Sequence, residues 1–291
     1  MDRLTHRKSD GGFFWGIPAF LWQIFFFYIP LTFLISTSFV KYCPELSTSV
    51  FTLDHYKSLC KMVYFVAIMR SLMLAAITVI VCLCIAYPVA YYLAIRVQRF
   101  KTILFALLIL PFWTNFLLLV YAWYFLLEND GLINFFLLKL GIITAPLHLM
   151  NCQLAVYCGM FYCYLPFMLL PLYSTFERFD TRLLEASYDL GASGWKTFRK
   201  ITLPLTMSGI RTGALLVFIP AFGEFVTPEL LGGDKSLYVG TAITHFFFTL
   251  HNVSLGSAFT CLSTLILIAV LALGYWITSW FGYVKGGASD E

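Results

Sequence analysis

Charged side chains are scarce in this sequence: Lys, Arg, Asp and Glu together make up only 12% of its 291 residues. Soluble domains typically carry about a quarter of such residues. Hydrophobic residues reach 60%, aromatic residues 19%, and the mean hydropathy is +0.83. Too little polar surface remains for a water-soluble globule. The composition therefore predicts that a lipid bilayer is the solvent for much of the chain.

Several motifs are also missing. No GxxxxGK[ST] loop occurs, so the chain is not expected to hold the phosphates of ATP itself. The eight cysteines and five histidines show no metal-ligand spacing. Cys43 and Cys60 share one expected external loop, where a disulfide and two free thiols are both open alternatives. The first apolar stretch is too long for a signal-peptide core, which favours a retained anchor.

Long intervals without charge predict an all-α membrane protein with six transmembrane helices. A helix needs about 20 apolar residues to span the hydrocarbon core. The expected spans are 13–36, 64–95, 102–127, 152–173, 206–226 and 257–281. The interval 236–284 is long enough for two crossings, but its polar first part favours a helix or loop outside the membrane. Five or seven crossings remain alternatives.

The distribution of Lys and Arg predicts the orientation. With both termini cytoplasmic, 13 of the 19 basic residues fall on the inner side, as the positive-inside rule requires. Residues 1–12 and 284–291 then form cytoplasmic tails of a transmembrane domain over 13–283. The net charge of +4 is thus a topology signal, and it indicates no nucleic-acid partner.

A polar segment over 174–205, between the fourth and fifth spans, interrupts the apolar pattern. Its part EASYDLGASGWKTFRKITLP carries five charges. The pattern predicts two short amphipathic helices on the cytoplasmic side, the first capped by Thr181. Gly191 joins them, because glycine accepts a positive φ at little cost, and Pro204 is expected to end the second. Such a projection suits docking into a groove on another protein.

The spacing within this segment resembles the coupling-loop signature (the EAA motif) of ABC importer permeases. The matching residues are Glu185, Ala186, Gly191, Ile201, Leu203 and Pro204. One departure is Ser187, where the family usually has a second Ala. In that family the loop sits in a cleft of the ATP-binding subunit. The resemblance implies a type I (MetI-like) permease fold with ATP and Mg bound by a partner, and with no cofactor, metal or catalytic residue in this chain.

Four further blocks resemble the spermidine/putrescine permeases of the PotB type. They are LPFWTNFLLLVYAW (110–123), ENDGLIN (128–134), YLPFMLLPLY (164–173) and FGEFVTPELLGG (222–233). The resemblance extends from about residue 13 to 281. It implies a multi-pass protein of the bacterial inner membrane with three kinds of partner: a second homologous permease, a dimer of ABC ATP-binding subunits and an extracytoplasmic polyamine-binding protein.

A polyamine crossing the membrane needs carboxylates or aromatic faces around its ammonium groups. The pathway candidates are Trp113, Asn115, Tyr121, Trp123 and Glu224. An interfacial aromatic belt is the alternative for the aromatic residues, and a salt bridge or helix-end role is the alternative for Glu224.

Two other functions remain open. One is an ABC importer for another solute, such as thiamine, iron or phosphate. The other is an ion-gradient-driven secondary transporter, which would be expected to carry ionisable residues in several spans.

Overall fold

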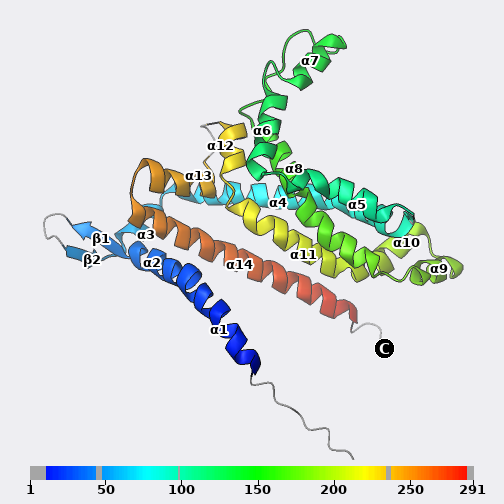
Figure 1. The fold of residues 1–291 in the computed structure, drawn as a ribbon, viewed down its shortest axis with the longest axis horizontal. Coiled ribbons are helices and arrows are strands. Elements are labelled where there is room, and N and C mark those ends of the chain that lie inside the picture. Colours follow the sequence, from blue (N-terminus) through cyan, green and yellow to red (C-terminus); the bar gives the residue numbers. More distant parts are fainter. Residues whose placement is uncertain (1–10, 44–47, 98, 234–236, 287–291) are drawn as a thin grey trace, which may run out of the picture. The chain divides into compact units, whose positions relative to one another are not determined.

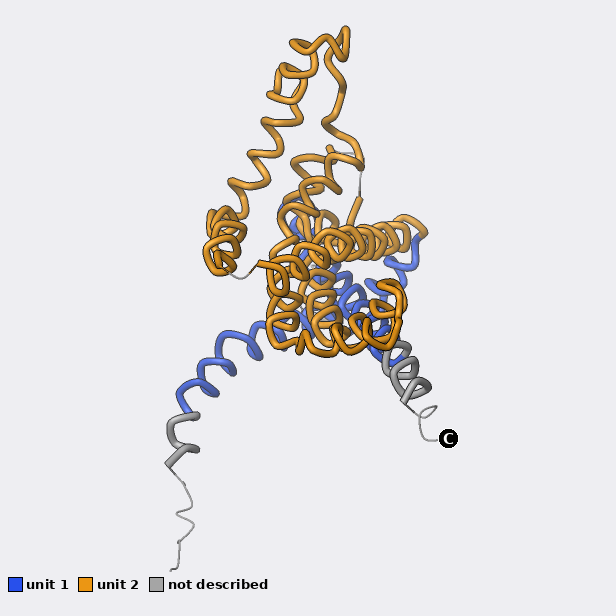
Figure 2. The backbone as a smooth tube through the Cα atoms, turned by 90° about the vertical axis from the view of Figure 1, so that its right-hand side faces the viewer, with its two compact units in different colours: residues 1–61, 245–291 blue, residues 62–244 orange. Residues whose placement is uncertain are grey.

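The structure, a computed structural model, describes residues 11–43, 48–97, 99–233 and 237–286. The expected tails over 1–12 and 284–291 therefore lie mostly outside the described residues. The chain divides into two compact units, residues 1–61 with 245–291, and residues 62–244 (Figure 2). Almost every described element is a helix (Figure 1).

The first unit contains the N-terminal and C-terminal helices. Its elements are α1 (Gly11–Gln23), η1 (Ile24–Tyr28), α2 (Ile29–Ser38), β1 (Val40–Cys43), β2 (Thr48–Phe51), α3 (Asp54–Leu59), η5 (His245–Thr249) and α14 (Val253–Gly286). Helix α2 packs on α14, where the Thr37 hydroxyl donates to Ser257 Oγ at 3.0 Å. The antiparallel pair of β1 and β2 is a feature that the sequence did not predict.

The candidate Cys43–Cys60 disulfide falls partly outside this description. The side chain of Cys43 is not among the described ones, whereas Cys60 carries a free, exposed thiol.

The second unit is built around α4 (Met62–Tyr91), α8 (Gln153–Glu177) and α11 (Leu203–Phe222), which pack on one another. Glycines allow α11 to approach α8 closely: a β-carbon at Gly213 would lie 2.7 Å from the sulfur of Met168. The remaining elements are η2 (Tyr92–Arg96), α5 (Lys101–Ile109), η3 (Leu110–Trp113), α6 (Phe116–Leu127), α7 (Leu132–Lys139), α9 (Arg182–Asp189), α10 (Gly194–Thr197), η4 (Phe198–Thr202), α12 (Val226–Gly232) and α13 (Val239–Thr244).

Six helical segments in the described residues are long and apolar enough to span a membrane, which confirms the predicted number. They are Ile17–Ser38, Met62–Arg96, Phe116–Lys139, Gln153–Glu177, Gly194–Phe222 and Val253–Trp276. The interval 236–284 holds one of them, preceded by the shorter apolar helix Val239–Thr249. In the described part of that interval, one helix is therefore long enough to cross a membrane, and the polar first part is a shorter helix.

The range 102–127 is not one continuous helix, contrary to the sequence-based boundaries. The first helix ends at Trp113 and a second begins at Phe116. Pro111 lacks the N–H group that would continue the helical hydrogen bonds. Asn115 then has extended backbone, and its Oδ1 accepts a hydrogen bond of 2.9 Å from the Leu117 N–H. Helix α7 consequently lies away from α4, α8 and α11 (Figure 1), whereas α6 keeps contact with α8.

The expectation that Pro204 ends a helix is wrong. The helical segment Gly194–Phe222 runs through it, and Pro204 is the second residue of α11, directly after the π-helical turn η4. The Thr181 hydroxyl makes no capping hydrogen bond at the start of α9, although its carbonyl accepts from the Leu184 and Glu185 N–H groups; the Asp180 carboxylate accepts from the Arg182 N–H at 3.0 Å. Helix α11 stops at Phe222, earlier than the expected 226, because the chain turns at Gly223.

Candidate functional site

The polar segment forms the short helix α9 and, after Gly191, the helical turn α10, which continues through η4 into α11 instead of ending as a second short helix. Gly191, which follows α9, has a φ of +74°. Its N–H donates to the Tyr188 carbonyl at 2.9 Å, and the next N–H, of Ala192, donates to the Ser187 carbonyl at 3.1 Å. No atom lies within 4 Å of the position that a β-carbon would take on Gly191. The backbone angle, and not lack of space, therefore requires glycine here.

A pair of hydroxyl groups joins the two helices. Ser187 on α9 and Thr197 on α10 are both buried, and their oxygens lie 2.7 Å apart in a hydrogen bond. Ser193 caps α10, because its Oγ accepts from the Lys196 N–H at 3.4 Å. The bend at Gly191 is thus closed by a polar contact across it.

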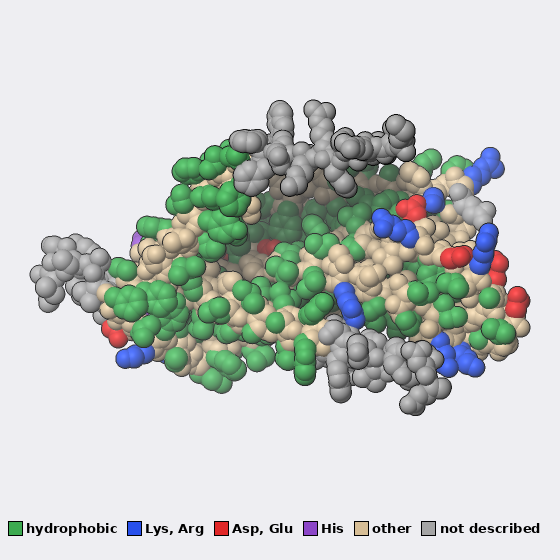
Figure 3. Space-filling view, turned by 90° about the horizontal axis from the view of Figure 1, so that it is seen from below, with side chains coloured by type: hydrophobic (Ala, Val, Ile, Leu, Met, Phe, Trp, Pro, Cys, Tyr) green, Lys and Arg blue, Asp and Glu red, His purple; other side chains and the backbone are tan. Residues whose placement is uncertain are grey.

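The outer face of this pair of helices is apolar. Leu190 is 87% exposed and Trp195 is 70% exposed. Lys, Arg, Asp and Glu side chains gather at the same end of the molecule, where α9 and α10 lie (Figure 3). Of the six signature residues, Glu185, Ala186, Gly191 and Pro204 are exposed, and Ile201 and Leu203 are half-buried. Large apolar side chains in a charged region indicate a surface for a protein partner.

Aromatic contacts connect the base of this segment to the membrane helices. The ring of Phe198 in η4 lies 5.8 Å from the ring of Tyr87 in α4, which in turn lies 5.2 Å from Phe176 in α8. The Tyr87 hydroxyl shares a hydrogen bond of 3.0 Å with Thr206 in α11. Phe198 and Tyr87 thus connect η4 to α4, α8 and α11 through packed side chains.

An ion pair lies close to the same end. Lys101 Nζ at the start of α5 lies 2.9 Å from the Glu177 carboxylate at the end of α8. The hydrogen bond and the charge of Glu177 raise the pKa of Lys101. Both side chains are largely exposed, so this pair orients α5 and contributes little to stability.

Glu224 lies at the turn between α11 and α12. Its Oε2 accepts a hydrogen bond of 2.6 Å from the Tyr164 hydroxyl on α8. Its Oε1 accepts from the N–H groups of Val226 at 2.9 Å and Thr227 at 3.4 Å. The carboxylate thus caps α12, which is the helix-end role considered for it. These donors are all neutral, and no ion pair of Glu224 is found among the described residues.

The backbone of this turn is closely packed. A β-carbon at Gly240 of α13 would lie 2.5 Å from the Gly223 carbonyl oxygen and 2.6 Å from that of Glu224. Helix α13 is itself fixed to α4, because the Ser71 hydroxyl accepts from the Val239 N–H at 2.8 Å. A non-helical turn next to an apolar helix end is typical of membrane proteins at positions that line a cavity or are buried in protein.

The other pathway candidates lie elsewhere. Trp113 is 83% exposed and Tyr121 is exposed on α6. Asn115 is occupied as the cap of α6. Trp123 is half-buried, with its ring 5.7 Å from Tyr162 on α8. Among the described residues, none of these four is a hydrogen-bond partner of Glu224.

Two polar partners were missed by the sequence reasoning. Tyr164 is separated from Glu224 by 60 residues, and no spacing rule pairs them; the only available signal is that each lies in one of the four conspicuous blocks. Thr227, whose buried hydroxyl has no hydrogen-bond partner among the described residues, lies next to the Glu224 cap. Nothing in the sequence distinguishes Thr227 from other threonines in apolar helices.

Comparison with known proteins gives consistent matches. The profile of the family described as "Binding-protein-dependent transport system inner membrane component" matches residues 86–283. The spermidine/putrescine transport system permease protein PotB of Escherichia coli K12 is 40% identical over 259 residues, which are 89% of this chain and 94% of that protein. PotB of Haemophilus influenzae is 39% identical over 258 residues, or 88% and 90% of the two chains.

A solved structure has the same fold. It is a bacterial alginate ABC transporter in complex with an alginate pentasaccharide-bound periplasmic protein, and the TM-score is 0.69. The match covers 88% of this chain and 90% of that chain at 15% identity. This likeness establishes the fold of an ABC importer permease for the present chain.

Proposed function

This chain belongs to the family of binding-protein-dependent transport system inner membrane components, and we propose that it is the permease subunit of an ATP-driven importer of spermidine and putrescine. The main support for spermidine and putrescine as substrates is the 40% identity to a PotB permease over 89% of the chain. Six apolar helices fit a multi-pass protein of the inner membrane.

The importer would contain this chain as one half of its translocation pathway. The other half is a second, homologous permease, and an extracytoplasmic binding protein delivers the polyamine. ATP and Mg are bound by a separate dimer of ABC subunits, so the chain has no enzymatic activity of its own. The permease fold that it shares with an ABC transporter crystallised with a periplasmic protein supports this assembly.

Coupling to the ATPase would take place at α9 and α10. Two observations support this role: the exposed Leu190 and Trp195 provide an apolar docking face, and Phe198 links that face to Tyr87 of α4. Closure of the ATPase would move α9 and α10 as one body, since the Ser187–Thr197 hydrogen bond joins them. Glu185, Ala186, Gly191, Ile201, Leu203 and Pro204 form this coupling segment.

Glu224 would be the contact of this chain with the cation. A half-buried carboxylate whose described partners are neutral donors retains its attraction for an ammonium group. The fixed geometry keeps the desolvated charge in one place. Trp113, Asn115, Tyr121 and Trp123 remain candidates for other parts of the pathway, where aromatic faces would stabilise cations.

Uptake measurements test the function. The chain is expressed with its neighbouring ATPase, permease and binding-protein genes in cells that lack polyamine uptake. We expect ATP-dependent accumulation of labelled spermidine or putrescine, and no competition by thiamine, iron or phosphate. Competition by one of these solutes at comparable concentration would support the alternative importer. Uptake that follows the ion gradient, and continues with an ATPase-inactive partner, would support a secondary transporter.

A further inference from the structure

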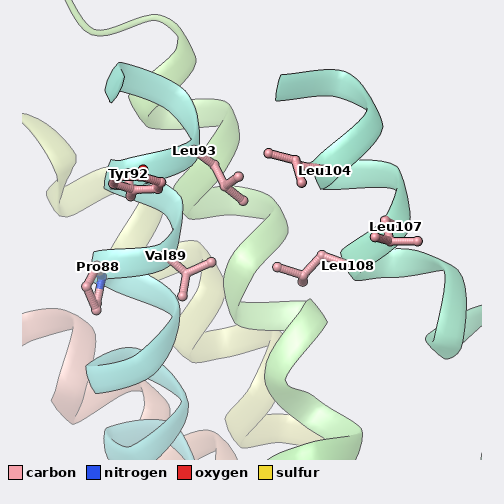
Figure 4. A pocket seen from close by; sticks show the side chains of 7 residues that line it. All are labelled: Pro88, Val89, Tyr92, Leu93, Leu104, Leu107 and Leu108. Atoms are coloured by element: carbon pink, nitrogen blue, oxygen red, sulfur yellow. The ribbon is translucent and has the colours of Figure 1, made fainter. Parts of the chain in front are cut away.

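An apolar groove lies between α4 with η2 on one side and α5 on the other. Its volume is about 530 Å³, within the range of roughly 300–1,000 Å³ that ligand pockets occupy. Val89 and Leu93 face Leu104 and Leu108 across it (Figure 4). Tyr92 and Leu107, which also line the groove, are largely exposed, so it opens to the surface of the molecule.

Helix α5 contacts η2 at one end of the groove and is held to α8 by two side-chain contacts. The rings of Phe105 and Tyr173 stack at 4.0 Å, and Lys101 pairs with Glu177 at 2.9 Å. These two contacts orient α5 and leave its leucines facing α4 across a gap.

A second cavity continues the groove along α4. It has a volume of about 250 Å³ and shares Val89, Leu107 and Leu108 with the first. It reaches Ile85, and Tyr162 and Leu169 of α8 line it as well. The lining of both cavities is almost wholly apolar, which suits a long hydrocarbon chain.

One end of the groove is basic. Arg96 ends the π-helical turn η2, four residues beyond Tyr92 of the groove lining. On α5, Lys101 begins the helix, three residues before Leu104. Arg96 and Arg99 are exposed, and no ion pair of either is found among the described residues. Arg99 lies over the ring of Phe100 and Lys101 is paired with Glu177, so three cations that are close together in the chain accompany one carboxylate at this end.

The dimensions match one leaflet of a bilayer. From Arg96 to Ile85 is 11 residues, or about 16 Å of helix at ~1.5 Å per residue. Half of a hydrocarbon core of about 30 Å is ~15 Å. Basic pockets between transmembrane helices, next to the membrane surface, bind anionic lipid head groups.

We propose that this groove is a binding site for an anionic phospholipid of the surrounding bilayer. The phosphate lies among Arg96, Arg99 and Lys101, and one acyl chain extends along α4 past Val89 towards Ile85. Bound lipid fills the gap between α4 and α5 and holds the short helix α5 against the membrane helices. The site is separate from Glu224 and from α9 and α10, and it does not depend on which solute is transported.

The test uses the assembled transporter in nanodiscs of equimolar phosphatidylglycerol and phosphatidylcholine with the same acyl chains. Native mass spectrometry of the complex counts the lipids that remain bound. We expect a several-fold excess of phosphatidylglycerol on the wild type. Arg96→Gln with Arg99→Gln should bring the ratio close to one. Lys57→Gln with Lys61→Gln, which removes the same charge in and just after α3, should leave it unchanged.

A second pair of variants tests the acyl-chain groove. Leu107→Trp should fill the groove and lower the retention of both lipids. Ile103→Trp is the matched control, since Ile103 is 65% exposed on the same helix but does not line the groove. Equal retention of the two lipids by the wild type, or a preference that survives Arg96→Gln with Arg99→Gln, would overturn the proposal. So would efficient cross-linking of a cysteine at position 107 to the second permease, which would identify a protein helix as the occupant.

Discussion

Ser187 and Thr197, ten residues apart in the chain, share a buried hydrogen bond of 2.7 Å between their hydroxyl groups. The position of Ser187 is the one at which the coupling signature usually has alanine. The Ser187 hydroxyl therefore has the Thr197 hydroxyl as its hydrogen-bond partner. A buried hydroxyl without a hydrogen-bond partner lowers stability by about 1–3 kcal/mol. The effect of substituting one of the two residues is therefore expected to depend on whether the other hydroxyl is present.

A double-mutant cycle measures this dependence. Thr197→Val leaves the Ser187 hydroxyl buried without its partner and should weaken ATPase binding and uptake. Ser187→Ala with Thr197→Val removes both hydroxyl groups and should recover most of the ATPase binding and uptake that Thr197→Val loses. The expected coupling energy between the two substitutions is roughly 1 kcal/mol or more. The measurement is co-purification of the ATPase together with uptake per cell at matched expression. Additive losses in the double variant would contradict the pairing.

Gly191 should be replaceable only by residue types that readily adopt a positive φ. Gly191→Ala is expected to cost about 1–2 kcal/mol, the penalty of the left-handed region, and to reduce uptake. Gly191→Asn should retain more activity, because Asn populates this region more readily. Gly194→Ala is the control, since Gly194 has equally open surroundings but no positive φ. Equal uptake by the two alanine variants would refute the backbone argument.

Glu224→Gln should preserve the shape of the turn and slow polyamine uptake. Loss of a hydrogen bond to a charged group is worth about 1.5–3 kcal/mol, or about tenfold to a hundredfold in affinity. Glu229→Gln, an exposed carboxylate on the same helix α12, should have no effect. Tyr164→Phe removes a neutral donor and keeps the charge, so uptake should persist in part. If Glu224→Gln transports at the wild-type rate with the ATPase bound, the carboxylate is only a helix cap.

Cys60 offers a native reporter of orientation, because its thiol is free and exposed in the loop expected outside the membrane. In intact cells, with the outer membrane made permeable, an impermeant maleimide should label it, and Cys43→Ser with Cys60→Ser should abolish the labelling. In that background Lys196→Cys should react only after the inner membrane is opened. Labelling of position 196 in intact cells would reverse the predicted topology.

The features that depend on composition and spacing were predictable from the sequence. Most of the six spans follow from long uncharged intervals, although the span 206–226 contains Arg211 and Glu224. The bend at Gly191 follows from a glycine between two amphipathic stretches. Both are local properties, decided by residues that are neighbours in the chain.

The features that depend on tertiary contacts were not predictable. Prolines are common in membrane helices, so Pro111 alone did not predict a helix end. The break is visible only in the structure, where the Asn115 side chain caps the new helix α6. Pro204, by contrast, lies inside the helical segment Gly194–Phe222, directly after the π-helical turn η4, and does not end it. Tyr164 and Glu224 meet because α8 packs on α11, and this long-range pairing leaves no periodic pattern in a single sequence.

The exposed Leu190 and Trp195 have a consequence for the life of the protein in the cell. If these side chains dock on the ATPase as proposed, a newly made chain without that partner would present both to the cytoplasm, where chaperones and proteases recognise exposed apolar surface. Copies made in excess of the partner would then be degraded faster than assembled ones. The abundance of this chain should follow that of the ATPase, so that the docking face would also set the stoichiometry of the complex.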